Sequence, residues 1–249
     1  MFSNSYIFRF ASIMVILVAT LLSAAALLLK PMQDRNISIE KMQDILTASN
    51  IPANADNAID LYNENMVQEL AVNLSGEVKA VYTSSGFEEG NVRAFDIKVN
   101  EALKQIADFR TGKSTTEPLL PVFIIKSPND SKTYVFPIRG VGLWGPVWGN
   151  VALKEDLVTI AGVKFDHKGE TPGLGAEIST DDFANQFIGK RIFDSQGNFV
   201  SVKVIKGDAS GDHEVDAISG GTITSDGVSE MLYSGLENYL PFIKSLKVL

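Results

Sequence analysis

A run of glycines and small hydroxyl residues between Asp216 and Ser225 is the segment of this chain best suited to holding a phosphate group. Ser219 and Thr222 flank two adjacent glycines, and the run leads directly into the last predicted helix. Glycines allow a bulky phosphate to approach the backbone, and a helix N-terminus favours an anion. The segment therefore predicts a phosphate site. Thr224 or Ser225 is also expected to cap the helix, a role that is compatible with phosphate binding.

Both tryptophans of the chain, Trp144 and Trp148, lie in a glycine-rich loop that runs from Arg139 to Gly149. Four glycines and one proline remove side-chain bulk beside the two large aromatic rings. Such a loop can form a flat slot for a planar ligand, because aromatic rings stack well on one another. A tight turn with two buried tryptophans explains the same residues equally well, so the loop alone does not assign a function.

The segment from Gly169 to Gly175 reads Gly-Glu-Thr-Pro-Gly-Leu-Gly. Pro172 followed by Gly173 predicts a turn with positive φ at the glycine. This turn presents backbone N–H and C=O groups that can bind the edge of a ring carrying both donors and acceptors. Most Pro-Gly turns bind nothing, so this pattern is weak when it is taken alone.

Other common chemistries find little support in the sequence. His167 and His213 each have an acidic residue three positions later, which fits exposed loop histidines better than a metal site. The chain has no cysteine, which excludes disulfides, iron–sulfur ligation and thiolate zinc sites. Neither a Walker A sequence nor a Gly-x-Ser-x-Gly elbow is present, and Gly173 and Gly175 lack the third glycine of a dinucleotide-binding loop.

Charge is distributed unevenly along the 249 residues, which carry a net charge of −8. Arg9 and Lys30 are the only charged residues among the first thirty, so the remainder has 20 basic and 30 acidic residues, or −10. An acidic domain repels phosphate backbones, so nucleic acid is not expected as a partner.

The uncharged run from Phe10 to Leu29 is twenty residues long. At about 1.5 Å per residue it spans a hydrocarbon core of roughly 30 Å, which predicts a retained transmembrane anchor. A cleaved signal peptide with its site near Ser23–Ala26 is the alternative. A short N-terminal tail and a large C-terminal part favour a cytoplasmic tail at residues 1–9 and a domain outside the cytoplasm.

The remaining pattern predicts an α+β fold with a mostly antiparallel sheet and flanking helices, preceded by one transmembrane helix. We expect a membrane-proximal helical segment at 30–75 and a ligand-binding domain at 76–249. The predicted helices are Ser38–Ala48, Ala58–Val72 and Asp226–Leu240, the last ended or kinked by Pro241. The predicted strands are Gly76–Tyr82, Pro121–Ile125, Tyr134–Ile138, Gly149–Leu153, Leu157–Phe165 and a hairpin from Ile192 to Ile205. The turn residues 127–130 are expected to join Pro121–Ile125 and Tyr134–Ile138 as a further hairpin.

Taken together, the three glycine-rich segments resemble the covalent FMN-binding domain family. Its members include the C subunit of the Na+-translocating NADH:quinone reductase and the G subunit of the related Rnf complex. The flavinylation motif of the family is Asp, two variable residues, Ser or Thr, Gly, usually Ala, and the acceptor Thr. In this chain the motif is Asp216-Ala-Ile-Ser219-Gly220-Gly221-Thr222. Gly221 departs from the usual Ala but keeps the side chain small.

The resemblance extends over nearly the whole chain. Gly169–Gly175 matches a second family signature, and Gly142–Trp144 and Val204–Gly207 match further family positions. The choice of the quinone reductase over Rnf rests on the Gly-Leu-Trp-Gly-Pro loop, the glycine before Glu170 and the long region before residue 120.

The resemblance implies a phosphoester between Thr222 and the ribityl phosphate of FMN, installed by a flavin transferase that consumes FAD. Thr171 and Leu174 would border the flavin ring, Trp144 would lie near it, and Lys206 could pair with the phosphate. The full set of cofactor-binding residues that the resemblance implies is Leu143, Trp144, Glu170, Thr171, Gly173, Leu174, Gly175, Lys206, Ser219, Gly220, Gly221 and Thr224.

The resemblance also implies an electron carrier of the bacterial inner membrane with its domain on the periplasmic side. The flavin would take electrons from an iron–sulfur centre in other subunits and pass them to a flavin on the B subunit. The A, B, D, E and F subunits would be its partners, and this chain would not be catalytic alone. The alternatives are an Rnf-type G subunit, a flavin-free anchored binding domain outside the cytoplasm, and a Thr- or Ser-nucleophile hydrolase, for which no paired base is visible.

Overall fold

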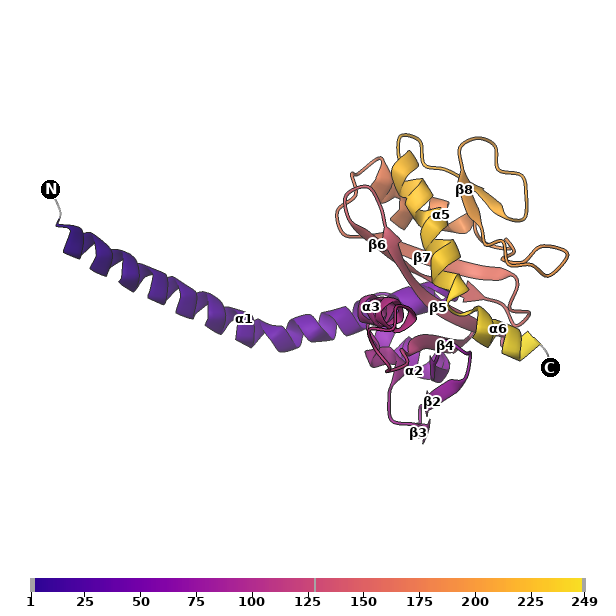
Figure 1. Cartoon of the computed structure of the whole chain (residues 1–249), viewed down its shortest axis with the longest axis horizontal. Coiled ribbons are helices and arrows are strands. Elements are labelled where there is room, and N and C mark those ends of the chain that lie inside the picture. The colour runs from indigo at the N-terminus through magenta and orange to yellow at the C-terminus, as the bar shows by residue number, and fades with distance from the viewer. Residues whose placement is uncertain (1–2, 128, 248–249) are drawn as a thin grey trace. The chain divides into compact units, whose positions relative to one another are not determined.

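The computed structural model describes residues 3–127 and 129–247, and the chain divides into two units, Met1–Lys41 and Met42–Leu249. Figure 1 shows their secondary structure. The first two residues of the predicted cytoplasmic tail and Pro128 of the predicted 127–130 turn lie outside the described residues.

Helix α1 runs without interruption from Asn4 to Ala48. It contains a window with a mean hydropathy of 2.6, so it is long and apolar enough to cross a membrane, and it includes the predicted span at 10–29. The helix predicted over Ser38–Ala48 is confirmed at its end, but it is the last part of α1 and not a separate helix, because the chain stays helical through Pro31. A proline removes only one helical N–H, and here the chain stays helical on both sides of it.

Seven antiparallel strands form the main sheet in the order β3-β2-β1-β4-β5-β6-β7. The strands are β1 (Met66–Val72), β2 (Val78–Thr83), β3 (Gly86–Glu89), β4 (Leu120–Lys126), β5 (Lys132–Val141), β6 (Pro146–Leu153) and β7 (Ile160–His167). Strands β4 to β7 are joined by successive hairpins, as the sequence predicts for the β4–β5 pair. The predicted fold class is therefore confirmed.

The helix predicted over Ala58–Val72 is correct only in its first half. Helix α2 ends at Asn65, and β1 begins at Met66 between β2 and β4. Met66, Val67 and Leu70 are spaced as on a helix face, but pairing with strands on both sides outweighs this local preference. The sheet therefore begins ten residues before the predicted domain start at 76, so 30–75 is not a purely helical segment.

Alternate residues of the strands supply two hydrophobic cores, one on each face of the sheet. Phe123, Ile125 and Val135 pack on one face with the end of α1 and α2. Phe136 and Ile138 belong to the larger core on the other face. The helices that contribute to the larger core are α3 (Val99–Arg110), α4 (Asp181–Asn185), α5 (Thr222–Glu237) and α6 (Leu240–Lys247). Two short 3-10 helices, η1 (Ala94–Asp96) and η2 (Gly175–Ser179), complete the unit.

The C-terminal part departs from the predicted hairpin and last helix. Phe193 and Phe199 form only an isolated bridge, while β8 (Lys203–Ile205) pairs in parallel with β9 (Glu214–Asp216). The last long helix, α5, begins at Thr222, four residues earlier than predicted. It ends at Glu237, three residues before the predicted Leu240, and Pro241 lies in the first turn of the further helix α6.

Helix α5 packs closely on β5, and two glycines make this approach possible (Figure 1). A Cβ on Gly140 would lie 2.6 Å from Cβ of Met231, and a Cβ on Gly235 would lie 2.7 Å from Cγ2 of Ile138. Because α5 packs tightly on β5 at Gly140 and Gly235, the start of α5 lies beside the end of β5.

Gly140→Ala is expected to lower the free energy of unfolding by about 1–3 kcal/mol, the range for overpacking a core. The added methyl group has no room beside Met231. Gly145→Ala is the matched control, since nothing lies within 4 Å of a Cβ there and its φ is not positive. Urea denaturation of both variants measures the difference, and equal midpoints would contradict the packing argument.

Candidate functional site

The three segments selected from the sequence meet at one cavity of about 220 Å³. The turn between β5 and β6, the loop after β7 and the first turn of α5 form its walls. The residues that line it are Leu143, Glu170, Thr171, Leu174, Gly175, Gly220, Gly221, Thr222, Ile223 and Thr224. All but Ile223 are among the residues predicted from the sequence.

The loop after β7 contains the predicted turn. Gly173 has φ +74°, and the N–H of Leu174 donates to the carbonyl of Thr171 at 3.1 Å. Proline at the second position and a glycine with positive φ at the third are the features of a type II turn. The turn leads into η2 and directs Leu174 toward the cavity.

The segment before α5 keeps the backbone accessible. Gly220 has φ +73°, a conformation that residues with a Cβ rarely adopt, and a Cβ there would lie 2.6 Å from Cδ2 of Leu174. Gly221 is the N-cap of α5 and has an ordinary φ of −108°. A Cβ on Gly221 would lie 3.0 Å from Cγ2 of Ile218. An alanine at 221 thus needs a shift of only a few tenths of an ångström.

Three neighbouring hydroxyls differ sharply in their surroundings. Thr224 and Ser225 are each 1% exposed, and both hydroxyls are hydrogen-bonded, to Glu170 and to the N–H of Ile218. Thr222 is exposed, lines the cavity and makes no hydrogen bond through its hydroxyl to any described residue. The predicted capping by Thr224 or Ser225 is wrong, because the helix starts at Thr222 and both residues lie inside it.

Glu170 is the buried carboxylate of the site. Its side chain accepts hydrogen bonds from the N–H of Trp144 at 2.8 Å and from the hydroxyl of Thr224 at 2.6 Å. Its own N–H donates to Nδ1 of His167 at 3.2 Å. The second histidine, His213, lies with Nδ1 2.6 Å from the carbonyl oxygen of Arg191. No cluster of three metal-ligating side chains occurs among the described residues.

Neither tryptophan is buried. Trp144 is 68% exposed, and only its backbone is tied to the cavity through Glu170. Trp148 is half-buried on β6, with the guanidinium of Arg139 5.4 Å from its ring centroid. The alternative of two buried tryptophans is therefore wrong, although Trp144 stands at the rim beside Leu143.

Three motif residues lie near the cavity without lining it. Asp216 ends β9, and its Oδ1 accepts from the N–H of Ala209 at 2.7 Å. Lys206 follows β8 directly, where Ile205 pairs with Asp216. Ser219 is exposed in the loop before α5. The structure therefore does not bring Lys206, Asp216 or Ser219 into the wall of the cavity.

Ile223, which the sequence reasoning missed, is exposed beside Thr222 and lines the cavity. Its position next to Thr222, the acceptor that the family resemblance implies, was the available signal. Together with Leu143 and Leu174 it provides apolar walls around a mouth that has no charged side chain other than the buried Glu170.

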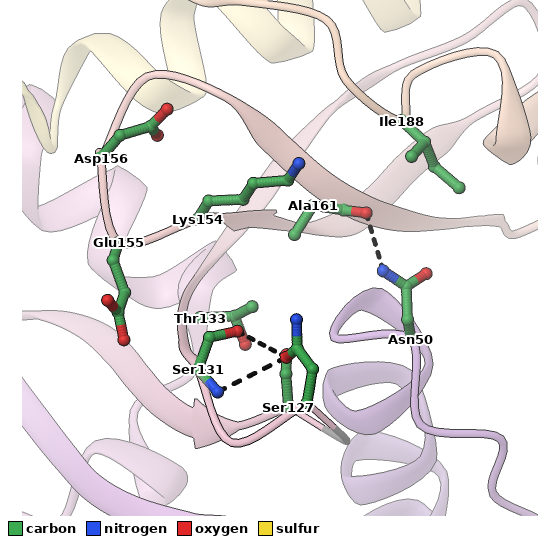
Figure 2. A pocket seen from close by; sticks show the side chains of 10 residues that line it. Asn50, Ser127, Ser131, Thr133, Lys154, Glu155, Asp156, Ala161 and Ile188 are labelled. Carbon is green, nitrogen blue, oxygen red and sulfur yellow. Dashed lines mark hydrogen bonds between the residues drawn. The ribbon is translucent and has the colours of Figure 1, made fainter.

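A larger cavity of about 580 Å³ lies at the opposite end of the sheet, between the β4–β5 and β6–β7 turns (Figure 2). Since β5 runs from one cavity to the other, the two are separated by about 30 Å at roughly 3.3 Å per residue. Asn50 donates to the carbonyl of Ala161 at 2.8 Å, and Asp156 accepts from Val158 and Thr159. These polar groups are engaged by the protein itself.

Several known proteins are similar to this chain in sequence. Residues 142–237 match the family described as FMN-binding domain. Over 95% of both chains, the sequence is 31% identical to the C subunit of the Na(+)-translocating NADH-quinone reductase of Pseudomonas aeruginosa. The protein of the same name from Vibrio alginolyticus is 29% identical over 91% of this chain and 89% of its own.

A solved structure agrees in fold as well. The crystal structure of the C subunit of the Na(+)-translocating NADH-quinone reductase from Parabacteroides distasonis superposes with a TM-score of 0.73 at 37% identity, covering 86% of this chain and 96% of that one. The cavity formed by the three glycine-rich segments lies within the part of the chain that matches the FMN-binding domain. The chain belongs to the family of C subunits of the Na+-translocating NADH-quinone reductase.

Proposed function

We propose that this chain is an electron-carrying flavoprotein subunit of a Na+-pumping NADH:quinone reductase and that it holds FMN by a phosphoester to Thr222. The observation that carries the proposal is the exposed, unengaged hydroxyl of Thr222 at a cavity of the FMN-binding domain. Of the hydroxyls in the first turn of α5, Thr222 alone among the described residues is accessible to a modifying enzyme.

The residues around Thr222 fit a phosphate and a planar ring. Gly220 and Gly221 leave the backbone open, and the start of α5 favours an anion. Leu143, Leu174 and Ile223 offer apolar surfaces to the ring. The ring would remain partly exposed, as electron exchange with other proteins requires.

A flavin transferase would attach FMN to Thr222 by a phosphoryl transfer from FAD. Oγ of Thr222 forms a bond to the FMN phosphorus of FAD, and the P–O–P bond breaks. AMP leaves with the bonding pair, and the hydroxyl proton passes to a base of the transferase. Asp216, Ser219 and Gly220 lie in the exposed segment beside the acceptor, where the transferase can recognise them.

When bound, the flavin would supply reversible electron transfer, from an iron–sulfur centre in other subunits to a flavin on the B subunit. The protein would supply the walls of the cavity, hold the segment before α5 in place and bury one face of the flavin ring. The other subunits, the transferase and the membrane are the proposed partners. The relatives named above are C subunits of the Na+-translocating enzyme, which favours this complex over an Rnf-type one, and the match to an FMN-binding domain argues against a flavin-free domain.

Expression of the full chain with and without a flavin transferase tests this function. With the transferase, we expect an intact mass increased by FMN minus water and a fluorescent band after denaturing electrophoresis. Without it, we expect the unmodified mass. An unmodified protein under both conditions would refute the proposal.

Reporter fusions at the C-terminus address the membrane topology. Helix α1 fits a membrane anchor, and we propose that the domain lies on the periplasmic side of the bacterial inner membrane. A fused alkaline phosphatase is expected to be active, because that enzyme folds in an oxidising compartment. Activity only from a reporter that works in the cytoplasm would reverse the orientation.

Trp144→Ala is expected to leave covalent FMN in place and to shift its midpoint potential by at most about 30 mV. An aromatic contact is worth about 0.5–1.5 kcal/mol, and 1.4 kcal/mol corresponds to about 30 mV for a two-electron couple. Trp148→Ala is the control, because its ring lies on the sheet beside Arg139. Spectroelectrochemistry measures both, and a larger shift in the control would contradict a rim position for Trp144.

A further inference from the structure

Glu170 is a buried carboxylate that has no partner of opposite charge among the described residues. It is 5% exposed, and no described lysine, arginine or histidine nitrogen forms a salt bridge with it. Burying a carboxylate without a cation is unfavourable unless hydrogen bonds replace the lost water. The arrangement that supplies these bonds therefore indicates what the side chain does.

The two oxygens of Glu170 bind two different segments. Oε1 accepts from the backbone N–H of Trp144 at 2.8 Å, and Oε2 accepts from the hydroxyl of Thr224 at 2.6 Å. The backbone of Glu170 is itself held by Nδ1 of His167. One carboxylate thus links the β5–β6 turn, the loop after β7 and the first turn of α5.

The neighbouring glycines leave room for this arrangement. A Cβ on Gly142 would lie 2.6 Å from Oε1 of Glu170, and a Cβ on Gly175 would lie 2.6 Å from Oγ1 of Thr224. Both positions must lack a side chain for the two hydrogen bonds to form. The absence of a side chain at Gly142 and Gly175 therefore makes room for the Glu170 carboxylate as well as for the cavity.

The hydrogen bonds that Glu170 accepts from Trp144 and Thr224, called the clamp below, act directly on the segment that contains Thr222. Thr224 is the third residue of α5 and Thr222 the first, so both belong to the same helical turn. Fixing Thr224 consequently limits the positions that the Thr222 hydroxyl can adopt.

We propose that Glu170 is a positioning residue for flavin attachment: its two hydrogen bonds hold the first turn of α5 against the β5–β6 turn and present the Thr222 hydroxyl at the cavity mouth. This inference rests on the proposed attachment at Thr222. It assigns Glu170 and Thr224 a role in ordering the acceptor, separate from contact with the flavin.

Four variants of the full chain separate the hydrogen bonds from the charge and the fold. Glu170→Ala and Thr224→Val each remove the link from one end. Glu170→Gln keeps it, because the amide oxygen can accept from Trp144 and the amide nitrogen can donate to the Thr224 oxygen. Thr224→Ser retains the hydroxyl. Thermal melting checks that each variant is folded.

The first readout is amide hydrogen exchange of the flavin-free protein at residues 225 and 226, because the N–H groups of the first three residues of α5 have no acceptor within the helix. Glu170→Ala and Thr224→Val are expected to exchange at least about tenfold faster there, since a hydrogen bond to a charged group is worth at least one factor of ten. Glu170→Gln and Thr224→Ser should match the unsubstituted chain. Unchanged exchange in the first pair would overturn the clamp whether or not flavin is attached.

The second readout is the initial rate of flavin attachment, followed by intact mass at fixed transferase and FAD. We expect Glu170→Ala and Thr224→Val to slow attachment by at least about tenfold and the two conservative variants to remain within about threefold. Equal rates in all four, or loss in Glu170→Gln equal to that in Glu170→Ala, would overturn the inference. If the unsubstituted chain itself takes up no flavin, the proposed function fails, while the exchange result still decides the clamp.

Discussion

Thr222→Val is expected to give a folded protein that carries no covalent flavin at all. Valine keeps the branched shape of threonine but lacks the oxygen of the proposed phosphoester. Because Thr222 is exposed at the start of α5, the free energy of unfolding should change by no more than about 0.5 kcal/mol. The measurement is intact mass and in-gel fluorescence after expression with a flavin transferase.

Thr222→Ser is the matched control for that variant. It retains a hydroxyl at the same backbone position and should therefore retain covalent flavin, at a rate that the transferase determines. Flavin on the valine variant would mean that another side chain is the acceptor. Loss of flavin from both variants, with unchanged folding, would mean that the methyl group of the threonine is also required.

A second large effect is expected away from the cavity, at the ion pair between the buried Glu69 and the partly exposed Arg93. Glu69 is 1% exposed on β1, and Nη2 of Arg93 lies 2.7 Å from its Oε1. The N–H of Phe95 and the hydroxyl of Tyr62 complete its hydrogen bonds. Burial, and then the carboxylate of Glu69, hold the pKa of Tyr62 well above its usual value, so the phenol stays protonated and continues to donate.

Arg93→Met is expected to lower the free energy of unfolding by about 3 kcal/mol, because it leaves the buried carboxylate without its counter-charge. For a domain of this size the melting temperature should fall by about 6–12 °C. Calorimetry on the chain measures this, and flavin attachment should continue below the transition. The guanidinium also lies 4.4 Å from the ring centroid of Tyr82, a contact that methionine only partly replaces.

Two comparisons make the Arg93 result decisive. Lys98→Met removes an exposed pair with Glu101 and should change stability by less than about 1 kcal/mol. Adding Glu69→Gln to Arg93→Met should recover part of the loss, since no charge is then buried. Equal effects of Lys98→Met and Arg93→Met would show that the Glu69 pair contributes no more than a surface ion pair.

Local sequence patterns located the segments that line the cavity better than they located the element boundaries. The Pro172-Gly173 turn and the glycines at 220 and 221 follow from backbone chemistry that acts over a few residues, whereas Thr222 as the FMN acceptor is implied by the family resemblance and stays a prediction. The structure brings nearly all of them to one cavity. The strands from β4 to β7 were recognisable because their apolar residues form short runs between turn residues.

The incorrect predictions concern segments whose structure depends on contacts with distant parts of the chain. Met66–Val72 has helical spacing but becomes β1 because β2 and β4 pair with it on both sides. Thr224 has the residue type of a helix cap, yet its hydroxyl binds Glu170, 54 positions earlier in the chain. No pattern within either segment contains that contact, so the clamp required the three-dimensional structure.

The most direct test of the account is the mass of the tryptic peptide that spans residues 207–244, taken from the chain expressed with a flavin transferase. This peptide contains Thr222 together with Ser219, Thr224 and Ser225. Fragmentation is expected to place the mass of FMN minus one water on Thr222 and on no other residue of the peptide. FMN mass on Thr224 or another residue, or an unmodified peptide, would contradict the assignment.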